Sequence, residues 1–83
     1  MYRLFLLASA EKDLDGLEGY AFAQIKAKMV SLKSDPRPPG SLKLTAHEGY
    51  RLRYGDYRIL YRIDDEREKI YIYKVKHRRE AYR

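Results

Sequence analysis

The segment from residue 50 to residue 63 constrains the fold more than any other part of the chain. It reads YRLRYGDYRILYRI, two runs rich in aromatic and branched residues around a central Gly-Asp pair at 55–56. Glycine at the first central position suits the two-residue turns whose twist matches a hairpin. We therefore predict two antiparallel strands in which Arg53 faces Arg58.

This hairpin separates its charges from its apolar groups, because successive side chains of a strand point to opposite faces of the sheet. One face receives Arg51, Arg53, Arg58 and Arg62. The other face receives Tyr50, Leu52, Tyr54, Tyr57, Ile59, Tyr61 and Ile63. Like charges directly opposite each other destabilise a sheet. A fold that sets Arg53 against Arg58 gives up stability, and an anionic ligand would be a reason to do so.

The segments before the hairpin predict a strand followed by a broken helical region. Residues 2–7 form an apolar run that suits a first strand, and Ser9 is placed to cap the helix after it. Gly16 and Gly19 interrupt the helical pattern, which favours two short helices over one rod. An apolar stripe at three- and four-residue steps marks the buried side of this region. Its members are Leu14, Leu17, Ala21, Ile25, Met29 and Leu32.

The remaining segments complete the order of elements. The proline-rich residues 35–40 form a stiff connector, and residues 42–44 predict a short strand. Residues 45–49 and 64–68 are polar turns, and residues 69–76 predict the last strand. This order predicts an α+β fold, in which an N-terminal strand and a helical hairpin pack on one face of a small antiparallel sheet. The other face of the sheet stays open.

Length and composition set bounds on the class of protein. The 83 residues allow a single domain over residues 1–83, with one modest core. The net charge of +6 points to a polyanion such as nucleic acid, or to an acidic protein partner. The absence of cysteine excludes disulfides and thiolate metal sites, and makes the cytoplasm the expected location. The apolar run at residues 2–7 contains Arg3 and is too short for a membrane segment.

The last strand has two alternative registers. The first places Tyr71, Tyr73 and Val75 on the apolar face, and Lys74, Lys76 and Arg78 on the arginine face. The second turns Ile70 and Ile72 inward and leaves Tyr71 and Tyr73 on the open face, where they could stack bases. The first register is preferred because it gathers the charges.

The open face is therefore the candidate site. A merely solvated face usually mixes charges of both signs, whereas the acids here gather at the start of the helical region and in the turn at 64–66. We expect no metal and no cofactor, because no histidine or carboxylate pair outside the turns has ligand spacing. There is also no glycine-rich phosphate loop.

Two residues near the C-terminus are candidates for proton transfer. Neighbouring cations favour the neutral form of His77, which could accept a proton, although it could equally be an exposed histidine in a basic tail. Arg78 could hold a phosphate, and Tyr82 could stack on a base or move a proton. The alternative for this tail is a frayed terminus.

Three blocks of the chain resemble the RelE/ParE superfamily of toxins from type II toxin–antitoxin modules. They read PGSLKL at 39–44, YRLRYGDYRILY at 50–61 and VKHRREAY at 75–82. The spacing between the blocks also agrees, and size and element order match across nearly the whole chain. The resemblance implies a compact sheet flanked by helices, related in shape to small microbial ribonucleases.

The resemblance also implies an activity. RelE-type toxins enter the ribosomal A site and cut mRNA by attack of a ribose 2′-hydroxyl on the adjacent phosphate, without a metal. The catalytic positions of the family fall on Arg51, Arg53, Arg58, Arg78 and Tyr82. Further contacts to RNA are expected from Arg62, Lys74, Lys76, His77 and Arg79.

These positions imply a division of roles. Arg58 and Arg78 would stabilise the charge that develops on the phosphate, and Arg53 would position the backbone by a forked contact. Some RelE toxins have lysine where this chain has Arg51 and Arg53. Arginine is effectively never deprotonated, so the proton acceptor would be Tyr82 or neutral His77.

Two other functions are compatible with the resemblance. ParE-type members share the fold but inhibit DNA gyrase by a protein contact, and a non-catalytic relative could act only as an RNA-binding module or antitoxin. Retention of Arg58, Arg78 and Tyr82 favours the nuclease. The expected partners are the ribosome with its mRNA and a cognate antitoxin, which would lay an acidic amphipathic segment on the basic domain. A toxin–antitoxin heterotetramer is one expected assembly.

Overall fold

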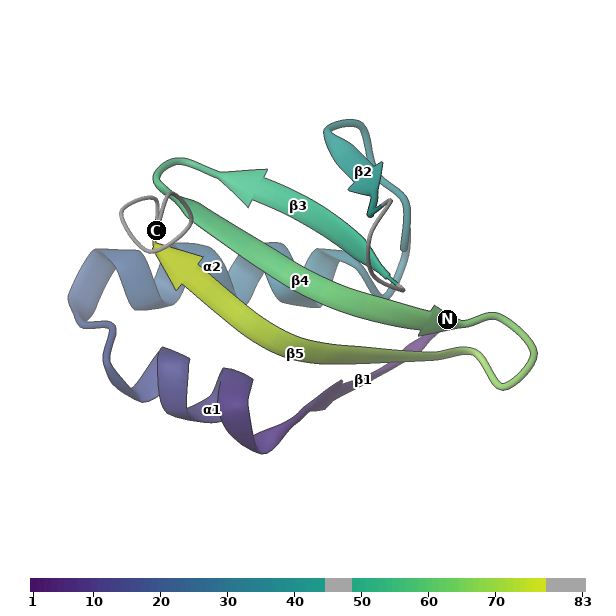
Figure 1. The fold of residues 1–83 in the computed structure, drawn as a ribbon, viewed down its shortest axis with the longest axis horizontal. Coiled ribbons are helices and arrows are strands. Elements are labelled where there is room, and N and C mark those ends of the chain that lie inside the picture. The colour runs from purple at the N-terminus through teal and green to yellow at the C-terminus, as the bar shows by residue number, and fades with distance from the viewer. Residues whose placement is uncertain (45–48, 78–83) are drawn as a thin grey trace.

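A computed structural model describes residues 1–44 and 49–77 of the chain. Five strands and two helices follow one another in the order β1, α1, α2, β2, β3, β4, β5 (Figure 1). Their bounds are β1 Arg3–Leu6, α1 Ala8–Asp15, α2 Gly19–Ser31, β2 Ser41–Lys43, β3 Tyr50–Tyr54, β4 Tyr57–Asp64 and β5 Lys69–His77. The predicted sequence of elements is therefore confirmed.

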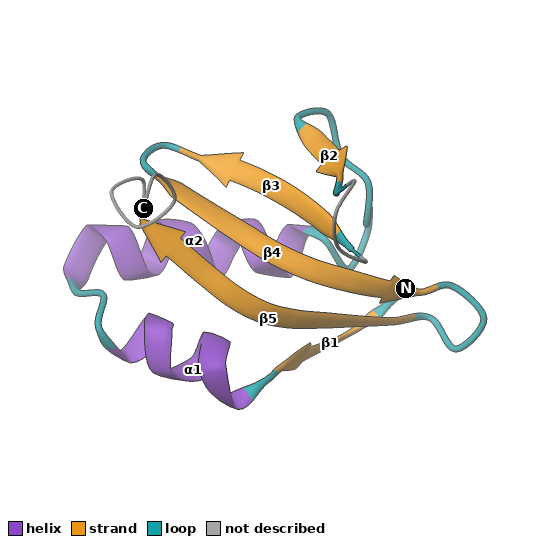
Figure 2. Ribbon diagram, viewed as in Figure 1, coloured by secondary structure: helices purple, strands orange, loops and turns teal. Residues whose placement is uncertain are grey.

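The strands form one sheet in the order β1-β5-β4-β3-β2. All neighbouring strands are antiparallel except β1, which runs parallel to β5. The sheet is thus mixed, and the prediction of an antiparallel sheet was wrong for its first strand. Parallel neighbours need a long crossover connection. Here both helices and three strands lie between the two partners, so β1 can run alongside β5 (Figure 2).

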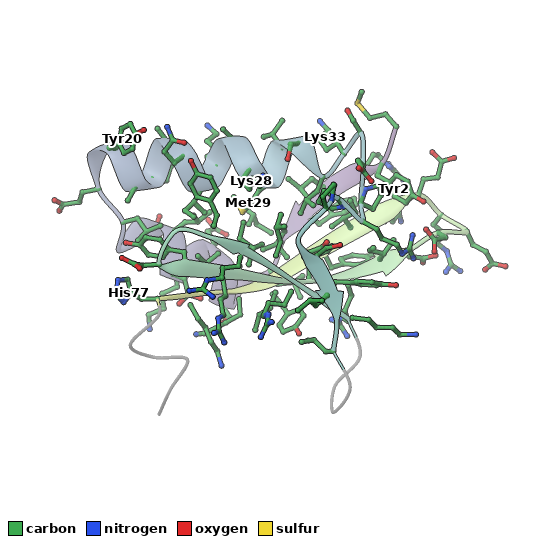
Figure 3. The ribbon with its side chains drawn as sticks, turned by 90° about the horizontal axis from the view of Figure 1, so that it is seen from above. Tyr2, Tyr20, Lys28, Met29, Lys33 and His77 are labelled. Carbon is green, nitrogen blue, oxygen red and sulfur yellow. The ribbon has the colours of Figure 1, made fainter. Side chains whose placement is uncertain are left out.

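The two helices pack on one face of the sheet, as predicted. Ile25 and Met29 of α2 are buried against Leu52, Ile59 and other residues of the inner sheet face. Figure 3 shows the labelled Met29 between α2 and the strands, and Tyr20 on the outer side of the helix. Full burial of such an aliphatic side chain contributes about 1.5–3 kcal/mol. The face away from the helices is left without a covering layer among the described residues.

The break between the helices lies where the glycines predict it, but Ser9 is not an N-cap. Helix α1 begins at Ala8, with Leu7 in the cap position and no side-chain cap. The Leu7 N–H still donates to the Ile72 carbonyl of β5, and the Leu7 carbonyl already accepts from Glu11. The chain therefore passes from strand to helix without a capping residue, and Ser9 falls inside the first turn.

A β-bulge in the last strand combines the two predicted registers. The pairing of β4 with β5 shifts so that Leu60 faces Lys74 while Tyr61 faces Ile72, which leaves Tyr73 as the extra residue. Ile70 and Ile72 are buried, so the preferred register was wrong for this half of the strand. Val75 is also buried, as that register predicted. The open face therefore gains Tyr71 and Tyr73 and still keeps Lys76.

The edge of β5 beyond β1 is closed by α1. One carboxylate oxygen of Asp13 accepts from the Val75 N–H at 2.9 Å, and the other oxygen lies 3.2 Å from Nζ of Lys74. This contact satisfies an edge donor that would otherwise be free for pairing with another chain. It also fixes α1 against the end of β5 that carries Lys76.

We expect Asp13→Ala to lower the free energy of unfolding by about 1–3 kcal/mol, because a part-buried N–H loses its charged acceptor. Asp15→Ala in the same helix is the matched control. Asp15 is exposed, so its loss should stay within about 0.5 kcal/mol. Urea unfolding followed by circular dichroism measures both variants, and equal midpoints for the two would contradict this role of Asp13.

A second polar cluster joins the connector after α2 to the β4–β5 turn. Arg37 binds both carboxylate oxygens of Asp65, at 2.8 and 3.3 Å, and its Nε donates to the Tyr50 hydroxyl at 3.0 Å. The Tyr2 hydroxyl donates to the same carboxylate at 2.6 Å. These hydrogen bonds, that of Arg37 before that of Tyr2, lower the pKa of Asp65 below its usual value.

This cluster predicts an acid-side loss of stability. A carboxyl group whose pKa is lower in the folded chain stabilises the fold above its unfolded pKa of about 4, and loses that contribution as the pH falls through the folded value. Asp65→Asn should therefore be less stable than the wild type at pH 7, with the difference shrinking below about pH 4. Thermal unfolding at pH 7 and pH 3 tests this, and a constant difference would contradict it.

Candidate nucleic-acid interface

Three cations lie in one row across the centre of the open face. Arg53 on β3 is directly opposite Arg58 on β4, and Arg58 is directly opposite Lys76 on β5. The turn at Gly55-Asp56 sets this register, as the sequence predicted. Arg53 is exposed, and the other two are half-buried. Facing side chains on neighbouring strands lie within about 5.5 Å at Cβ, so the row concentrates positive charge.

Four acids of the described residues form salt bridges away from Arg53 and Lys76. Within the described residues, the salt bridges join Asp65 to Arg37, Asp64 to Arg67, Asp13 to Lys74 and Glu68 to the N-terminal amine. None of them reaches Arg53 or Lys76. Arg53 and Lys76 therefore face Arg58 without a salt bridge to any carboxylate in the described part of the chain. This is the arrangement expected of a site for a phosphate or another anion.

A second row lies next to the first. It runs from Leu42 on β2 through Arg51 and Leu60 to Lys74. Arg51 therefore lies on the predicted face, with an apolar residue on each side. The ammonium of Lys74 is held by Asp13 at the sheet edge. Lys74 is consequently less free to contact a ligand than its strand position had predicted.

The turn end of the hairpin is fixed to the helical layer. The hydroxyl of Tyr54 hydrogen-bonds the side-chain oxygen of Gln24 on α2, and Nζ of Lys28 lies 5.7 Å from the centre of the Tyr54 ring. These contacts lie directly beside Arg53 in the sequence. They restrict the strand end that carries the cation row, which suits a site that must present charges in a fixed geometry.

His77 lies on the other side of the sheet from the row. It is opposite Tyr57, and the two rings meet edge to face with centroids 5.0 Å apart. Lys76, the residue before it, is the member of the row, so strand alternation turns His77 toward the helical side. Arg78, Arg79 and Tyr82 lie outside the described residues, and their predicted roles stay predictions.

The open face also holds aromatic residues that the preferred register had placed inside. Phe5 on β1 and Tyr71 on β5 are paired, and their rings stack with centroids 5.5 Å apart. The guanidinium carbon of Arg62 lies 5.7 Å from the centre of the Tyr73 ring. The signal for this arrangement was in the sequence, since Ile70, Ile72 and Val75 are spaced by two and then three residues. That change of spacing indicates a bulge.

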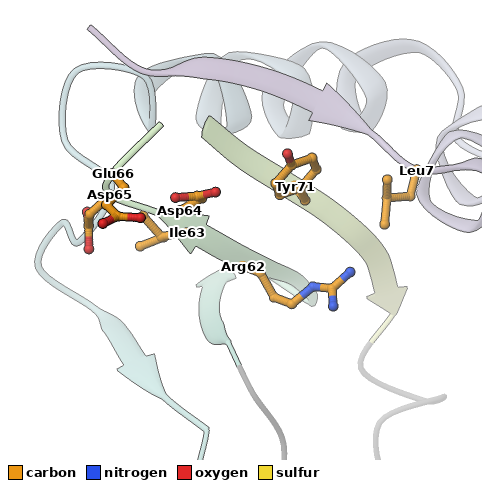
Figure 4. A pocket seen from close by; sticks show the side chains of 7 residues that line it. All are labelled: Leu7, Arg62, Ile63, Asp64, Asp65, Glu66 and Tyr71. Atoms are coloured by element: carbon orange, nitrogen blue, oxygen red, sulfur yellow. The ribbon is translucent and has the colours of Figure 1, made fainter. Parts of the chain in front are cut away.

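A shallow hollow of about 680 Å³ adjoins these aromatic residues. Figure 4 shows Tyr71, Arg62 and Leu7 toward one end and the acidic turn at 64–66 toward the other. Two of the three acids are engaged, Asp64 with Arg67 and Asp65 with Arg37. Within residues 1–44 and 49–77, no cluster of three or more histidine or acidic side chains is placed to hold a metal.

The described residues form a mixed sheet with helices on one face and a row of three cations on the other. The model of the ParE toxin of type II toxin–antitoxin systems matches residues 4–82. The chain therefore belongs to the RelE/ParE superfamily of type II toxin–antitoxin toxins. The resemblance predicted from the sequence motifs is confirmed.

Solved structures of toxins show the same fold. The RelBE2 toxin–antitoxin complex of Mycobacterium tuberculosis matches with a TM-score of 0.83 and 30% identity, over 93% of this chain and 98% of that chain. The RelE–RelB complex of Pyrococcus horikoshii gives 0.81 and 28%, over 93% and 94% of the two chains. The RelBE complex of E. coli gives 0.80 and 25%, over 93% and 96%. The comparison with curated proteins gives no significant match.

In the described part of the chain, neither α1 nor α2 combines the length and the apolar character that a bilayer crossing requires.

Proposed function

We propose that this toxin is a ribosome-dependent mRNA endonuclease of the RelE type. The observation that carries the proposal is the row of Arg53, Arg58 and Lys76 on an open sheet face. Maintaining three facing cations costs stability, and a bound RNA backbone would offset that cost. The similarity to RelE toxins along nearly their whole length supports the same conclusion.

The proposed reaction is an internal transfer at phosphorus. The ribose 2′-oxygen forms a bond to the adjacent phosphorus, the bond from phosphorus to the 5′-oxygen breaks, and the products carry a 2′,3′-cyclic phosphate and a 5′-hydroxyl. The 2′-hydroxyl loses a proton and the leaving oxygen gains one. Negative charge grows on the other phosphate oxygens in the transition state, and donors fixed beside them accelerate the reaction.

In this scheme Arg58 is the described residue best placed to stabilise the growing charge, because it is the middle member of the row. Arg53 holds the RNA backbone through its planar fork, and Arg51, Arg62 and Lys76, each on a different strand, extend the contact along the RNA. The family positions assign the remaining steps to Arg78 and Tyr82. The acceptor is Tyr82 rather than His77, whose ring packs against Tyr57 on the opposite side of the sheet.

A second candidate function is inhibition of DNA gyrase by direct protein contact. It is favoured by one observation, the match to the ParE family model over residues 4–82. Such a contact would not require the cation row to bind a ribose-phosphate linkage. The two functions are therefore separable by the molecule that is damaged, mRNA in the first case and DNA in the second.

The proposed partner is an antitoxin that neutralises the toxin. Toxins of similar structure were crystallised as complexes with RelB antitoxins. We infer that the cognate antitoxin of this chain carries an acidic amphipathic segment, because the chain has a net charge of +6. A toxin–antitoxin heterotetramer is the assembly that we propose for the complex.

One induced culture tests both candidate functions. Expression should stop translation, and mapping of mRNA ends should give new cuts within codons that occupy the A site. DNA breaks and the damage response should stay at the level of the uninduced culture. Intact mRNA together with stabilised DNA breaks would instead establish the gyrase function.

A further inference from the structure

The bulge at Tyr73 creates a surface that the catalytic positions of the family do not use. Phe5, Tyr71 and Tyr73 lie on the open face together with Arg62. Phe5 retains 37% of its exposed surface although it is a large apolar residue. Two more cations, Arg3 and Lys69, lie 5.8 and 5.7 Å from the centre of its ring.

Stacked rings with cations above them have a specific use in proteins that bind single strands. Unpaired bases stack on aromatic side chains and on guanidinium planes, while neighbouring cations hold the phosphates. The Phe5–Tyr71 pair is nearly parallel, with 23° between the ring planes. The guanidinium of Arg62 over Tyr73 offers a second flat surface, and Arg62 is exposed.

The position of these groups relative to the cation row supports one continuous path. Tyr71 and Lys76 lie on the same strand, five positions apart, which corresponds to about 16 Å. A few nucleotides of extended RNA span that distance. The shallow hollow lined by Arg62 and Tyr71 lies at this end of the face.

We propose that Phe5, Tyr71, Tyr73 and Arg62 form a stacking platform for unpaired bases of single-stranded RNA. The stacking of unpaired bases does not depend on whether the protein cuts RNA. A further role of the platform, which is to hold the message on one side of the linkage bound by Arg53 and Arg58, rests on the proposed function. The alternative occupant, an apolar protein segment, would use the aromatic rings but would not need the cations that lie over them.

The test is fluorescence anisotropy of the full-length chain with a short 5′-labelled oligoadenosine, a strongly stacking single strand. Tyr71→Val removes the ring and introduces a β-branched residue, which suits a strand. We expect its affinity to be at least about fivefold weaker than that of the wild type. Tyr71→Phe keeps the ring and should bind within about twofold of the wild type, because base stacking does not use the hydroxyl.

Tyr20→Ala is the matched surface control. Tyr20 is a tyrosine with 79% of its surface exposed, on α2 and away from the sheet, so its removal should leave RNA affinity unchanged. Circular dichroism confirms that each variant is folded. If Tyr71→Val does not fold, Arg62→Gln gives the second measurement, with weaker binding and a salt slope reduced by about one unit.

The outcomes separate this proposal from the nuclease proposal. Loss of RNA affinity in Tyr71→Val, in a protein that does not cut mRNA, supports the platform and contradicts the nuclease. Unchanged RNA affinity in Tyr71→Val overturns the platform. This holds even if the wild-type protein cuts mRNA, and even if the variant no longer binds a protein partner.

Discussion

Replacing Arg58 with glutamine should lower the rate of mRNA cleavage by about a hundredfold or more. Arg58 lies between Arg53 and Lys76 in the row, where its guanidinium can donate to phosphate oxygens as their charge grows. Removal of one such fixed donor typically costs two to three orders of magnitude in the chemical step. Single-turnover cleavage with ribosomes and a defined message measures this rate directly.

Arg67→Gln is the matched control for that variant. Arg67 is an exposed arginine in the β4–β5 turn, outside the row, and it pairs with Asp64. Its loss removes the same charge and should change the rate less than about threefold. If Arg58→Gln and Arg67→Gln lower the cleavage rate equally, Arg58 contributes only through the net charge of the protein. Arg58→Lys separates charge from fork geometry, and should recover only part of the rate.

Gly49→Ala should destabilise the fold strongly, by about 3 kcal/mol or more. Gly49 has a φ of 122°, and an added Cβ would lie 2.6 Å from the Tyr61 carbonyl oxygen and 3.2 Å from Cγ of Arg62. The neighbour is backbone of β4, which cannot move without opening the sheet. Urea unfolding gives the loss of stability.

Gly55→Ala is the matched glycine for this comparison. Gly55 also has a positive φ, of 57°, but nothing lies within 4 Å of an added Cβ. Only the backbone conformation is penalised there, at about 1 kcal/mol. Similar losses for the two variants would show that backbone conformation alone explains Gly49. The steric clash with β4 would then carry no weight.

The cation row could be predicted from the sequence because a tight turn fixes register. Once Gly55 is the first turn residue, the pairing of Arg53 with Arg58 follows from counting, and the observed register agrees. The separation of α1 from α2 followed in the same way from Gly16 and Gly19. These features depend on local chemistry within a few residues.

The features that could not be predicted depend on contacts between distant segments. The parallel pairing of β1 with β5 joins residues more than sixty positions apart. The retention of Lys74 by Asp13 joins two elements whose approach depends on how α1 crosses the sheet edge. The start of α1 at Ala8, ahead of Ser9, follows from the Leu7 hydrogen bond to β5.

The bulge in β5 could be predicted from the sequence only in part. A strict alternation forces a choice between burying Ile70 with Ile72 and burying Val75. The structure buries all three by inserting one extra residue. The cost of a local irregularity in β5 is offset by two isoleucines and a valine in the core, each contributing on the order of 1.5–3 kcal/mol. That comparison favours the bulge, and Tyr71 and Tyr73 are placed outside as its consequence.

The proposed function requires that the row of Arg53, Arg58 and Lys76 act on a ribose-phosphate linkage in the ribosomal A site. The most direct test incubates the toxin with purified ribosomes that carry a defined message. A metal chelator is present in an amount just sufficient to bind trace divalent ions. A single cut within the A-site codon is expected, with a 2′,3′-cyclic phosphate on the upstream fragment, and this cut should be absent with Arg58→Gln. An intact message with the wild-type toxin, or fragments ending in a 3′-hydroxyl, would contradict it.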